Sequence, residues 1–399
     1  MTTATDLDGF REELRAWARA NVHPELVGMD DMDVERDIWR SPEHPAHDAF
    51  LAYEKASLEA GLVCPHWAPE YGGRGLGEME MAVLAEELAA VGMPRLTRGM
   101  GERLCGPSII MHGTAEQKAH FLPRIISGED RYCQGFSEPG AGSDLASLVT
   151  RGVIEGDEIV ITGQKIWTSR AHLANVMFLL CRTDPDAPKH EGISFVIVPM
   201  HDNGIEIREL VTMTGDTAFC QEFIDGARAP LDNVIGGLGG GWKAAMTTLG
   251  SERGAVAAVQ HLQYQRELEE LVERARELNR IQDPTVRQEL AWAQCQVHVM
   301  KATGQRVLAR LSGGEKLGPE ASLTKLVWSE YHRRLGEIAM DLQGANGLIR
   351  PPGEGYPIDK WQKAFLSSRA ETIFAGSSEV QRRIIAERVL GLPREKAAK

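Results

Sequence analysis

The sequence predicts an α+β protein in which a middle domain of strands follows one helical domain and precedes another. Apolar residues recur at helical spacing over residues 1–129, and longer helical patterns return over 239–399. Between them, over 130–238, short runs of β-branched residues are separated by turns that contain Gly and Asp. This order differs from the regular strand–helix alternation of a doubly wound nucleotide-binding fold. We therefore expect three domains, with boundaries near 129/130 and 238/239.

The first domain is predicted to contain several amphipathic helices. Phe10, Leu14 and Trp17 recur at the i, i+4, i+7 spacing of one helix face. Residues 78–92 repeat this pattern and end at a glycine, which is a common helix stop. Thr114 stands directly before another apolar pattern, where its hydroxyl can cap a helix N-terminus.

The second domain is predicted to be a β-sandwich or barrel. Residues 151–169 indicate a hairpin with one turn at Gly156-Asp157 and a further turn at Gly163. More strand candidates follow at spacings typical of such folds: 175–184, 192–200 and 204–210.

The third domain is predicted to be a bundle of long antiparallel helices. Its helix candidates are 242–278, 284–311, 323–342 and a shorter one at 378–390. The glycine-rich run at 236–242 is not a dinucleotide fingerprint, because Trp242 stands where that motif needs a glycine.

Composition narrows the class of protein. The chain has 399 residues, and its net charge of −13 argues against broad binding to nucleic acid or anionic membranes. Its 6 cysteines are scattered, which fits a reducing compartment and predicts no disulfide framework. No apolar run is long enough to span a membrane, and the acidic N-terminus is not a signal peptide. We expect a cytoplasmic protein with no metal site.

A glycine-rich segment of the second domain, residues 132–147, is suited to binding a ligand. Gly140 and Gly142 let the backbone approach a ligand closely, and Ser137 and Ser143 supply hydroxyls. Backbone amides in such a loop can also bind anionic or carbonyl oxygens. The alternative is a turn that only connects two elements.

A second segment, residues 163–171, places Trp167 beside the hydroxyls of Thr168 and Ser169. A planar aromatic cofactor can stack on the indole, and its ring heteroatoms can bond the hydroxyls. The alternative is that Trp167 belongs to the core of the β domain.

Together these two segments resemble the acyl-CoA dehydrogenase family of flavoproteins. The resemblance covers nearly the whole chain, because further segments match the family in its order: "PHWAPEYGGRG", "GTAEQKAHFLPRIISGE", "SLTKLVWSE", "DLQGANG" and "GSSEVQRRIIAERVLGLPR". It implies the family's fold, which is an N-terminal helical domain, a middle β domain and a C-terminal four-helix bundle. It also implies FAD as the cofactor, lying between the β domain and the bundle.

The resemblance implies that residues of the two segments contact the flavin. Phe136 and Ser137 would border the isoalloxazine ring. Trp167, Thr168 and Ser169 would flank it, with a hydroxyl near N5 or O4.

The resemblance also assigns contacts elsewhere in the chain. Ser143 would contact the cofactor and the pantetheine arm of the substrate. The other implied FAD contacts are Gly142, Arg280, Gln343, Gly344, Ser377 and Glu379. Among these, Arg280 and residues 341–347 would reach the FAD of a neighbouring subunit. As alternatives, Arg280 is a plain surface charge and Glu379 only a favourable charge in the first turn of its helix.

Ala375 occupies the position at which well-known members of this family carry a catalytic glutamate. A methyl group accepts no proton, but the implied hydrogen bond from the backbone N–H to the thioester carbonyl remains. Glu252, directly before Arg253, resembles the glutamate of the isovaleryl and long-chain enzymes and is our candidate base. Arg253, Gly376 and Ala375 are expected to contact the substrate. The alternative for Glu252 is a solvated helix carboxylate.

The reaction implied by the resemblance is α,β-dehydrogenation of an acyl-CoA thioester to the trans-2-enoyl-CoA. An electron-transfer flavoprotein would accept the electrons, and the assembly would be a homodimer or homotetramer, with a heteromer as the alternative. Three other functions stay open. They are different flavin chemistry such as oxygenation or desulfination, a non-catalytic subunit of a heteromeric dehydrogenase, and a serine hydrolase using Ser322 and Lys325.

Overall fold

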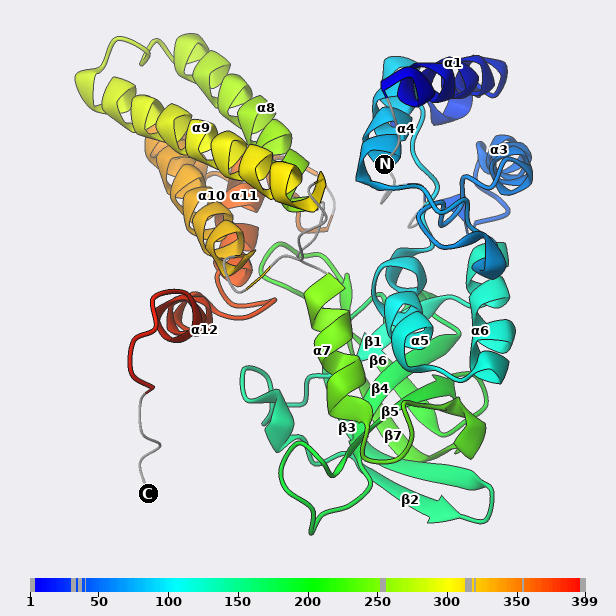
Figure 1. The fold of residues 1–399 in the computed structure, drawn as a ribbon. Helices are drawn as coiled ribbons and strands as arrows, with labels where there is room; N and C mark the ends of the chain where they lie inside the picture. Colours follow the sequence, from blue (N-terminus) through cyan, green and yellow to red (C-terminus); the bar gives the residue numbers. More distant parts are fainter. Residues whose placement is uncertain are drawn as a thin grey trace. The chain divides into compact units, whose positions relative to one another are not determined.

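A computed structural model describes residues 4–29, 34, 38–39, 41–251, 256–312, 318, 321–353 and 355–394 of the chain (Figure 1). The chain divides into two compact units. The first contains the described residues up to 251 except 210–218, and the second contains 210–218 with those from 256 onward. Helices come first, strands follow and helices return, which confirms the predicted α+β order. The finer division into three domains stays a prediction.

The first unit begins with helices that pack on one another. They are α1 (Ala4–Ala20), α3 (His47–Glu59), α4 (Glu78–Ala90), α5 (Gly106–His112) and α6 (Ala115–Ser127). Leu14, Phe50 and Leu84, from the first three helices, are buried in one shared core. Helix α6 begins as predicted. Thr114 Oγ1 accepts a hydrogen bond from the Gln117 N–H, and the Thr114 N–H donates to the Gln117 side chain.

The middle of the chain forms one mixed eight-stranded sheet. Its strands are β1 (Tyr132–Gly135), β2 (Arg151–Glu155), β3 (Glu158–Ser169), β4 (Val176–Arg182), β5 (Ile193–Pro199), β6 (Ile205–Leu210), β7 (Phe219–Pro230) and β8 (Val234–Ile235). The order across the sheet is β6-β7-β3-β2-β4-β5-β8, and β1 pairs in parallel with β4. Each strand candidate after the hairpin therefore exists, as β4, β5 and β6.

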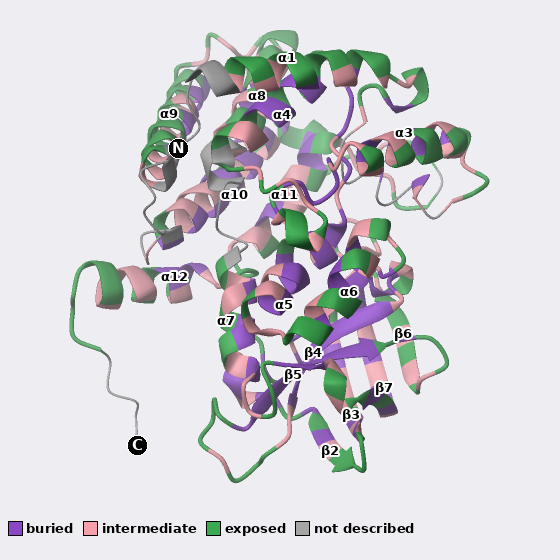
Figure 2. Ribbon diagram, turned by 45° about the vertical axis from the view of Figure 1, so that its right-hand side comes forward, coloured by how far each residue is buried: buried purple, intermediate pink, exposed green. Residues whose placement is uncertain are grey.

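Strands β4 and β5 are buried on both faces, which explains their unbroken apolar runs. In β4, Phe178 and Leu180 face a core shared with α5, α6 and α7 (Gly241–Ser251). Met177 and Leu179 face a second core that is built by the sheet itself. Figure 2 shows both strands largely in the colour of buried residues. The framework beneath the predicted site loops is thus packed from two sides.

Strands β2 and β3 form the predicted hairpin, with Gly156 at φ +68° in its turn. The predicted turn at Gly163 is wrong, because β3 continues through this residue to Ser169. Gly163 instead lies at a bulge where the register with β7 shifts. A Cβ there would lie 2.5 Å from Thr150 Oγ1, so close packing requires the glycine.

The second unit contains the predicted four-helix bundle. Its helices are α8 (Val256–Glu277), α9 (Pro284–Ser312), α10 (Ala321–Gln343) and α11 (Lys360–Glu371). Tyr331 and Leu335 of α10 are buried in its core. The helix predicted over 242–278 is described in two parts, α7 in the first unit and α8 in the second. Residues 252–255 lie outside the described residues.

The C-terminal part differs from prediction in two further details. Helix α11 was missed, although Asp359 caps it and forms a reciprocal capping box with Gln362. The helix predicted over 378–390 is α-helical as α12 (Ser378–Ile384) and continues as a π-helical turn, Ile385–Val389. Within the described ranges, no helix combines the length and the apolar character needed to cross a membrane. None of the 6 cysteines, all of which the structure describes, forms a disulfide, and only Cys295 is exposed.

Candidate functional site

The loop after β1 presents glycines and a serine to the surface. Glu138 and Ala141 exchange two backbone hydrogen bonds of 3.0 Å, so residues 138–141 do form a tight turn. Beyond it, Gly142 and Ser143 are exposed. A Cβ added at Gly140 or Gly142 would meet no atom within 4 Å. Nothing within the described chain requires these glycines, so their open side is free for a ligand.

A buried lysine ties this loop to β3. Lys165 Nζ donates to the Phe136 carbonyl over 3.1 Å and lies 2.9 Å from Glu138 Oε1. Glu138 also accepts hydrogen bonds from the N–H groups of Val149 and Thr150, at 2.7 and 2.8 Å. Burial lowers the pKa of Lys165. Burial alone would raise the pKa of Glu138, but Lys165, Thr150 and the Val149 N–H bring it below its ordinary value.

Phe136 lies in the core rather than on the loop surface. Its ring packs edge-on against Phe178 and Phe195, with centroids 5.7 and 6.0 Å apart. We therefore expect the backbone of Phe136, and not its ring, to contact a flavin. The neighbouring Ser137 is half-buried, and its carbonyl accepts a hydrogen bond from the Ile166 N–H over 3.0 Å.

Trp167 is the extra residue of a β-bulge. The register with β7 shifts between Ile166 and Thr168, and Trp167 has φ +64°. Its side chain is 59% exposed and touches Phe219 edge-on at 6.1 Å. The alternative that Trp167 is a core residue is therefore wrong.

The two hydroxyls beside Trp167 point to opposite sides of β3. Thr168 is buried, and its Oγ1 donates to Glu222 Oε2 over 2.6 Å. Ser169 is half-buried, and its hydroxyl has no hydrogen-bond partner among the described residues. An exposed indole, a free hydroxyl and an open glycine loop are what a planar cofactor with ring heteroatoms requires, so these residues fit FAD. Thr168 serves this surface only through its backbone.

The segment before α12 contains two residues in the left-handed region. Ala375 has φ +52° and Gly376 has φ +89°. The side-chain amide of Gln381 donates to the carbonyls of both residues. The Ala375 N–H has no acceptor among the described residues, so it is available to a ligand. Ser377 caps α12 by accepting from the Val380 N–H.

Three further cofactor candidates of this unit, Arg280, Gln343 and Gly344, lie at or contact the end of α10. Arg280 donates to the carbonyls of Asp341 and Leu342, at 3.0 and 3.3 Å. Arg280 is therefore held at the end of α10 by hydrogen bonds and is not a plain surface charge. The Gln343 side-chain nitrogen is buried with no partner among the described residues, and Gly344 has φ +57° with open space beside it. An orphaned donor next to an open glycine fits a ligand's polar group.

The remaining predictions have different outcomes. Glu379 is strongly exposed and lies 3.7 Å from Arg382, which agrees with either of its two interpretations. Glu252 and Arg253 lie outside the described residues. Sequence reasoning missed Glu138, Lys165 and Glu222. The signal for Lys165 was its place in β3, where the alternation assigns it to the buried face.

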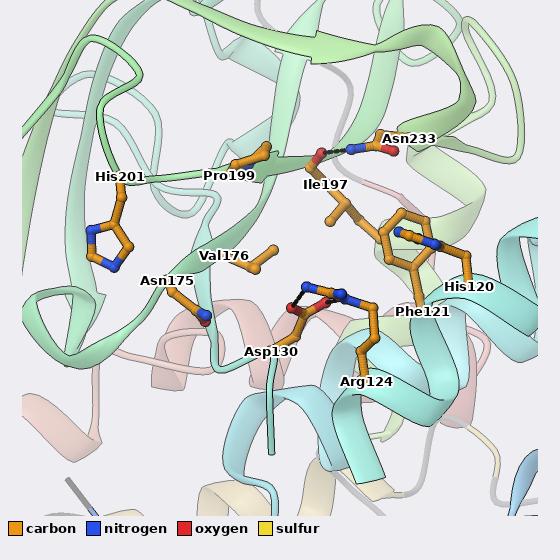
Figure 3. A pocket seen from close by; sticks show the side chains of 10 residues that line it. All are labelled: His120, Phe121, Arg124, Asp130, Asn175, Val176, Ile197, Pro199, His201 and Asn233. Atoms are coloured by element: carbon orange, nitrogen blue, oxygen red, sulfur yellow. Dashed lines mark hydrogen bonds and ion pairs between the residues drawn. The ribbon is translucent and has the colours of Figure 1, made fainter. Parts of the chain in front are cut away.

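A separate pocket of about 240 Å³ contains none of the predicted residues. Figure 3 shows it between α6 and the ends of β4 and β5, with Arg124 turned toward Asp130. Arg124 pairs with Asp130 at 2.8 Å, and Asn233 donates to the Ile197 carbonyl at 2.8 Å. These polar groups already bond one another, so this pocket is not our candidate site.

Comparisons with known proteins give matches along the chain. Models of the acyl-CoA dehydrogenase N-terminal, middle and C-terminal domains match residues 5–129, 133–224 and 239–390. The acyl-CoA dehydrogenase IpdE1 of Mycobacterium tuberculosis is 41% identical over 391 residues, which cover 98% of this chain and 99% of the relative.

Two solved structures are also similar. A structure described as the Tcur3481-Tcur3483 steroid ACAD is 33% identical with a TM-score of 0.77, covering 98% of this chain and 99% of that one. A chain of the ChsE4-ChsE5 complex from Mycobacterium tuberculosis is 29% identical with a TM-score of 0.73, covering 99% of this chain and 100% of that one.

Proposed function

Because the chain belongs to the acyl-CoA dehydrogenase family of FAD-dependent enzymes, we propose that it converts an acyl-CoA thioester to the trans-2-enoyl-CoA. The family establishes an enzyme that acts on acyl-CoA, and the roles of individual residues are our proposal. The observation that supports it most directly is the segment at Ala375, which offers a backbone N–H without an acceptor among the described residues but no carboxylate.

In this proposal the chain stabilises negative charge at the thioester and removes one proton. The α-C–H of a thioester is a weak acid, and a hydrogen bond to the carbonyl oxygen stabilises the developing enolate. The Ala375 N–H supplies that bond, and its left-handed backbone is fixed by Gln381. Glu252 accepts the α-proton, while Arg253, Gly376 and Ser143 contact the substrate. FAD, when bound, supplies the acceptor for the β-hydride.

We extend the proposal to a bulky, steroid-type acyl group. A relative of 33% identity is described as a steroid ACAD. In this chain Gly250 lies near the end of α7, and a Cβ there would meet no atom of the described residues within 4 Å. Space beside this part of α7 is consistent with a large ligand.

The partners in this proposal are an electron-transfer flavoprotein, which accepts the electrons, and further subunits. A homodimer or homotetramer is the simplest assembly. The ChsE4-ChsE5 complex favours a second candidate, in which this chain pairs with a different one and the partner performs the deprotonation. The family match removes the serine hydrolase alternative.

Glu252→Gln tests the proposed base. The variant keeps its bound FAD, but the substrate-dependent bleaching of the visible flavin band under anaerobic conditions slows by at least about a hundredfold, the low end for a general base. Glu269→Gln, an identical change at an exposed position of α8, is the control and leaves the rate unchanged. Bleaching of Glu252→Gln at the wild-type rate would show that another group is the base.

A panel of CoA thioesters tests the substrate class. The purified chain is mixed anaerobically with straight-chain, branched and steroid-derived thioesters, and flavin bleaching is followed. We expect the steroid-derived thioester to bleach fastest. No bleaching with any thioester, despite bound FAD, would favour the second candidate, and adding the partner chain would then restore it.

A further inference from the structure

Glu222 is a buried carboxyl group that the proposed reaction does not use. It lies in the middle of β7, directly opposite Lys165 of β3, and its side chain faces the interior of the sheet. Its Oε2 accepts the 2.6 Å hydrogen bond from Thr168. Its Oε1 is buried with no partner among the described residues. Burying a carboxyl group with only one of its oxygens hydrogen-bonded costs free energy, so a glutamate at a buried position of a central strand requires an explanation.

The cation nearest to Glu222 is committed elsewhere. Lys165 bonds Glu138 and the Phe136 carbonyl, and one ammonium group cannot neutralise two carboxylates equally. The titratable group that interacts with Glu222 from β7 itself is Cys220, whereas Cys181 of β4 interacts with Lys165 and Glu138; burial raises the pKa of both thiols. Burial raises the pKa of Glu222 to about 7, although Thr168 and Lys165 oppose the rise. Glu222 therefore changes protonation near neutral pH.

The bond between Thr168 and Glu222 lies directly at the bulge. In a regular strand, side chains alternate, so an inward Lys165 would put Trp167 inside and Thr168 outside. The structure reverses this order: Lys165 and Thr168 are buried, while Ile166 and Trp167 lie between them on the outer side. The Thr168 hydroxyl has its only described partner inside the sheet, and that partner is Glu222.

We propose that Glu222 is a positioning residue that holds Thr168 inward and thereby presents Trp167 and Ser169 to the flavin. This inference rests on the proposed function, because it takes the outer surface of the bulge as the flavin contact. The bond also offsets the cost of the left-handed backbone at Trp167, which a non-glycine residue adopts only when its surroundings fix it. A change in the charge of Glu222 then alters the surroundings of the flavin from the buried side of β3.

The test measures FAD binding and the visible circular dichroism of bound FAD, after the apoprotein has been reconstituted with FAD. Glu222→Val removes the acceptor and Thr168→Val removes the donor. Each is expected to weaken FAD binding about tenfold, the effect of one lost buried hydrogen bond, and the double variant is expected to be no worse than either single variant. Thr168→Ser keeps the hydroxyl and is expected to bind FAD as the wild type does.

The matched control is Thr162→Val, which makes the same change in the same strand. Thr162 also bonds β7, by accepting from the Gly226 N–H, but it lies at the other bulge. We expect this variant to bind FAD normally. If Glu222→Val does not fold, the comparison of Thr168→Val with Thr162→Val decides the question.

A pH titration separates positioning from general loss of structure. In the wild type the flavin dichroism is expected to change with a midpoint near pH 7, following Glu222. Glu222→Gln, which can still accept from Thr168 but does not titrate, is expected to bind FAD and to lose this transition. An unchanged transition in Glu222→Gln, or normal FAD binding by Thr168→Val, would overturn the inference.

Variants of the flavin-facing residues separate this inference from the proposed function. Trp167→Phe and Ser169→Ala are expected to change the dichroism of bound FAD. If they do so while Glu222→Val and Thr168→Val do not, the positioning role is wrong and the assigned flavin surface stands. If none of the four changes FAD binding or dichroism, the assigned flavin surface is wrong as well.

Discussion

The side-chain amide of Gln381 lies 3.0 Å from the Ala375 carbonyl oxygen and 3.3 Å from that of Gly376. One buried group of α12 thus fixes two successive peptide groups, both in residues with left-handed φ. A Cβ at Gly376 would lie 2.5 Å from the same amide nitrogen, so this contact also requires the glycine. The direction of the neighbouring Ala375 N–H depends on this arrangement.

Gln381→Met should impair catalysis more than cofactor binding. Methionine matches glutamine in size but donates no hydrogen bond, so both carbonyls lose their partner and the Ala375 N–H is no longer fixed. We expect bound FAD to be retained and anaerobic flavin reduction by substrate to slow about tenfold, equivalent to one hydrogen bond of about 1.4 kcal/mol.

Gln362→Met is the matched control for this prediction. Gln362 of α11 also donates from its amide to two backbone carbonyls, those of Gly347 and Ile349, at 2.8 and 2.9 Å. It should lower thermal stability without slowing flavin reduction. Equal slowing in both variants would mean that the bundle as a whole, and not the Ala375 segment, sets the rate.

Ala375 is predicted to tolerate glycine but not a β-branched residue. A left-handed φ of +52° is accessible to glycine without strain, whereas a branched Cβ makes it strongly unfavourable. Ala375→Gly should retain flavin reduction, because the N–H remains. Ala375→Val should lower the free energy of unfolding by about 1–3 kcal/mol and slow reduction. Stability is measured by thermal melting, and an Ala375→Val variant as stable as the wild type would show that this backbone is not strained.

Local patterns predicted the parts of the fold that depend on neighbours in sequence. The cap at Thr114 and the turn at Gly156 need only a few adjacent residues, and both are confirmed. The burial of Lys165 beside Glu138 and Glu222 depends on the register between β3, β7 and the loop after β1, which no single strand reveals. The bulge that turns Thr168 inward has the same origin, because a bulge is defined by its partner strand.

The two segments that can bind a ligand were predicted from residue types and the individual flavin contacts from the family resemblance, but neither predicted the directions of the side chains. Trp167 is exposed and Ser169 is half-buried, while the side chains of Phe136 and Thr168 turn into the core. Side-chain direction in these cases follows from packing against residues distant in sequence, such as Phe195 and Glu222. Helix α11 was missed for a simpler reason: the capping signal at Asp359 follows a Pro- and Gly-rich stretch that indicates a loop.

His332 is expected to make the bundle less stable as the pH rises. Its ring is buried between Glu371, at 2.7 Å, and Glu267, at 3.2 Å. Burial alone would lower its pKa, but the two carboxylates raise it from 6.5 to about 9. The charged form is therefore favoured in the folded state, and its contribution, about 3 kcal/mol, is complete below pH 6.5 and lost as the pH rises through about 9.

Thermal melting at two pH values checks this prediction. The wild type should lose more stability than His332→Gln between about pH 7 and about pH 10, because only the wild type loses a charged bridge there. The variant removes the titrating group and keeps a polar side chain of similar size. An equal loss of stability in the two proteins would show that His332 is neutral in the folded state.

The buried pair Lys165–Glu138 is expected to cost far more to break than an exposed ion pair. Both side chains are almost wholly buried, so Lys165→Met leaves an uncompensated carboxylate and should lower the free energy of unfolding by about 3–5 kcal/mol. Adding Glu138→Gln should restore part of this loss, because the pair is then neutral. Lys189→Met is the control: Lys189 pairs with Asp144 over a similar 2.7 Å, but both are exposed, so it should cost less than about 1 kcal/mol. Similar losses in the two lysine variants, measured by denaturant unfolding, would contradict the prediction, because burial is the difference between the two pairs.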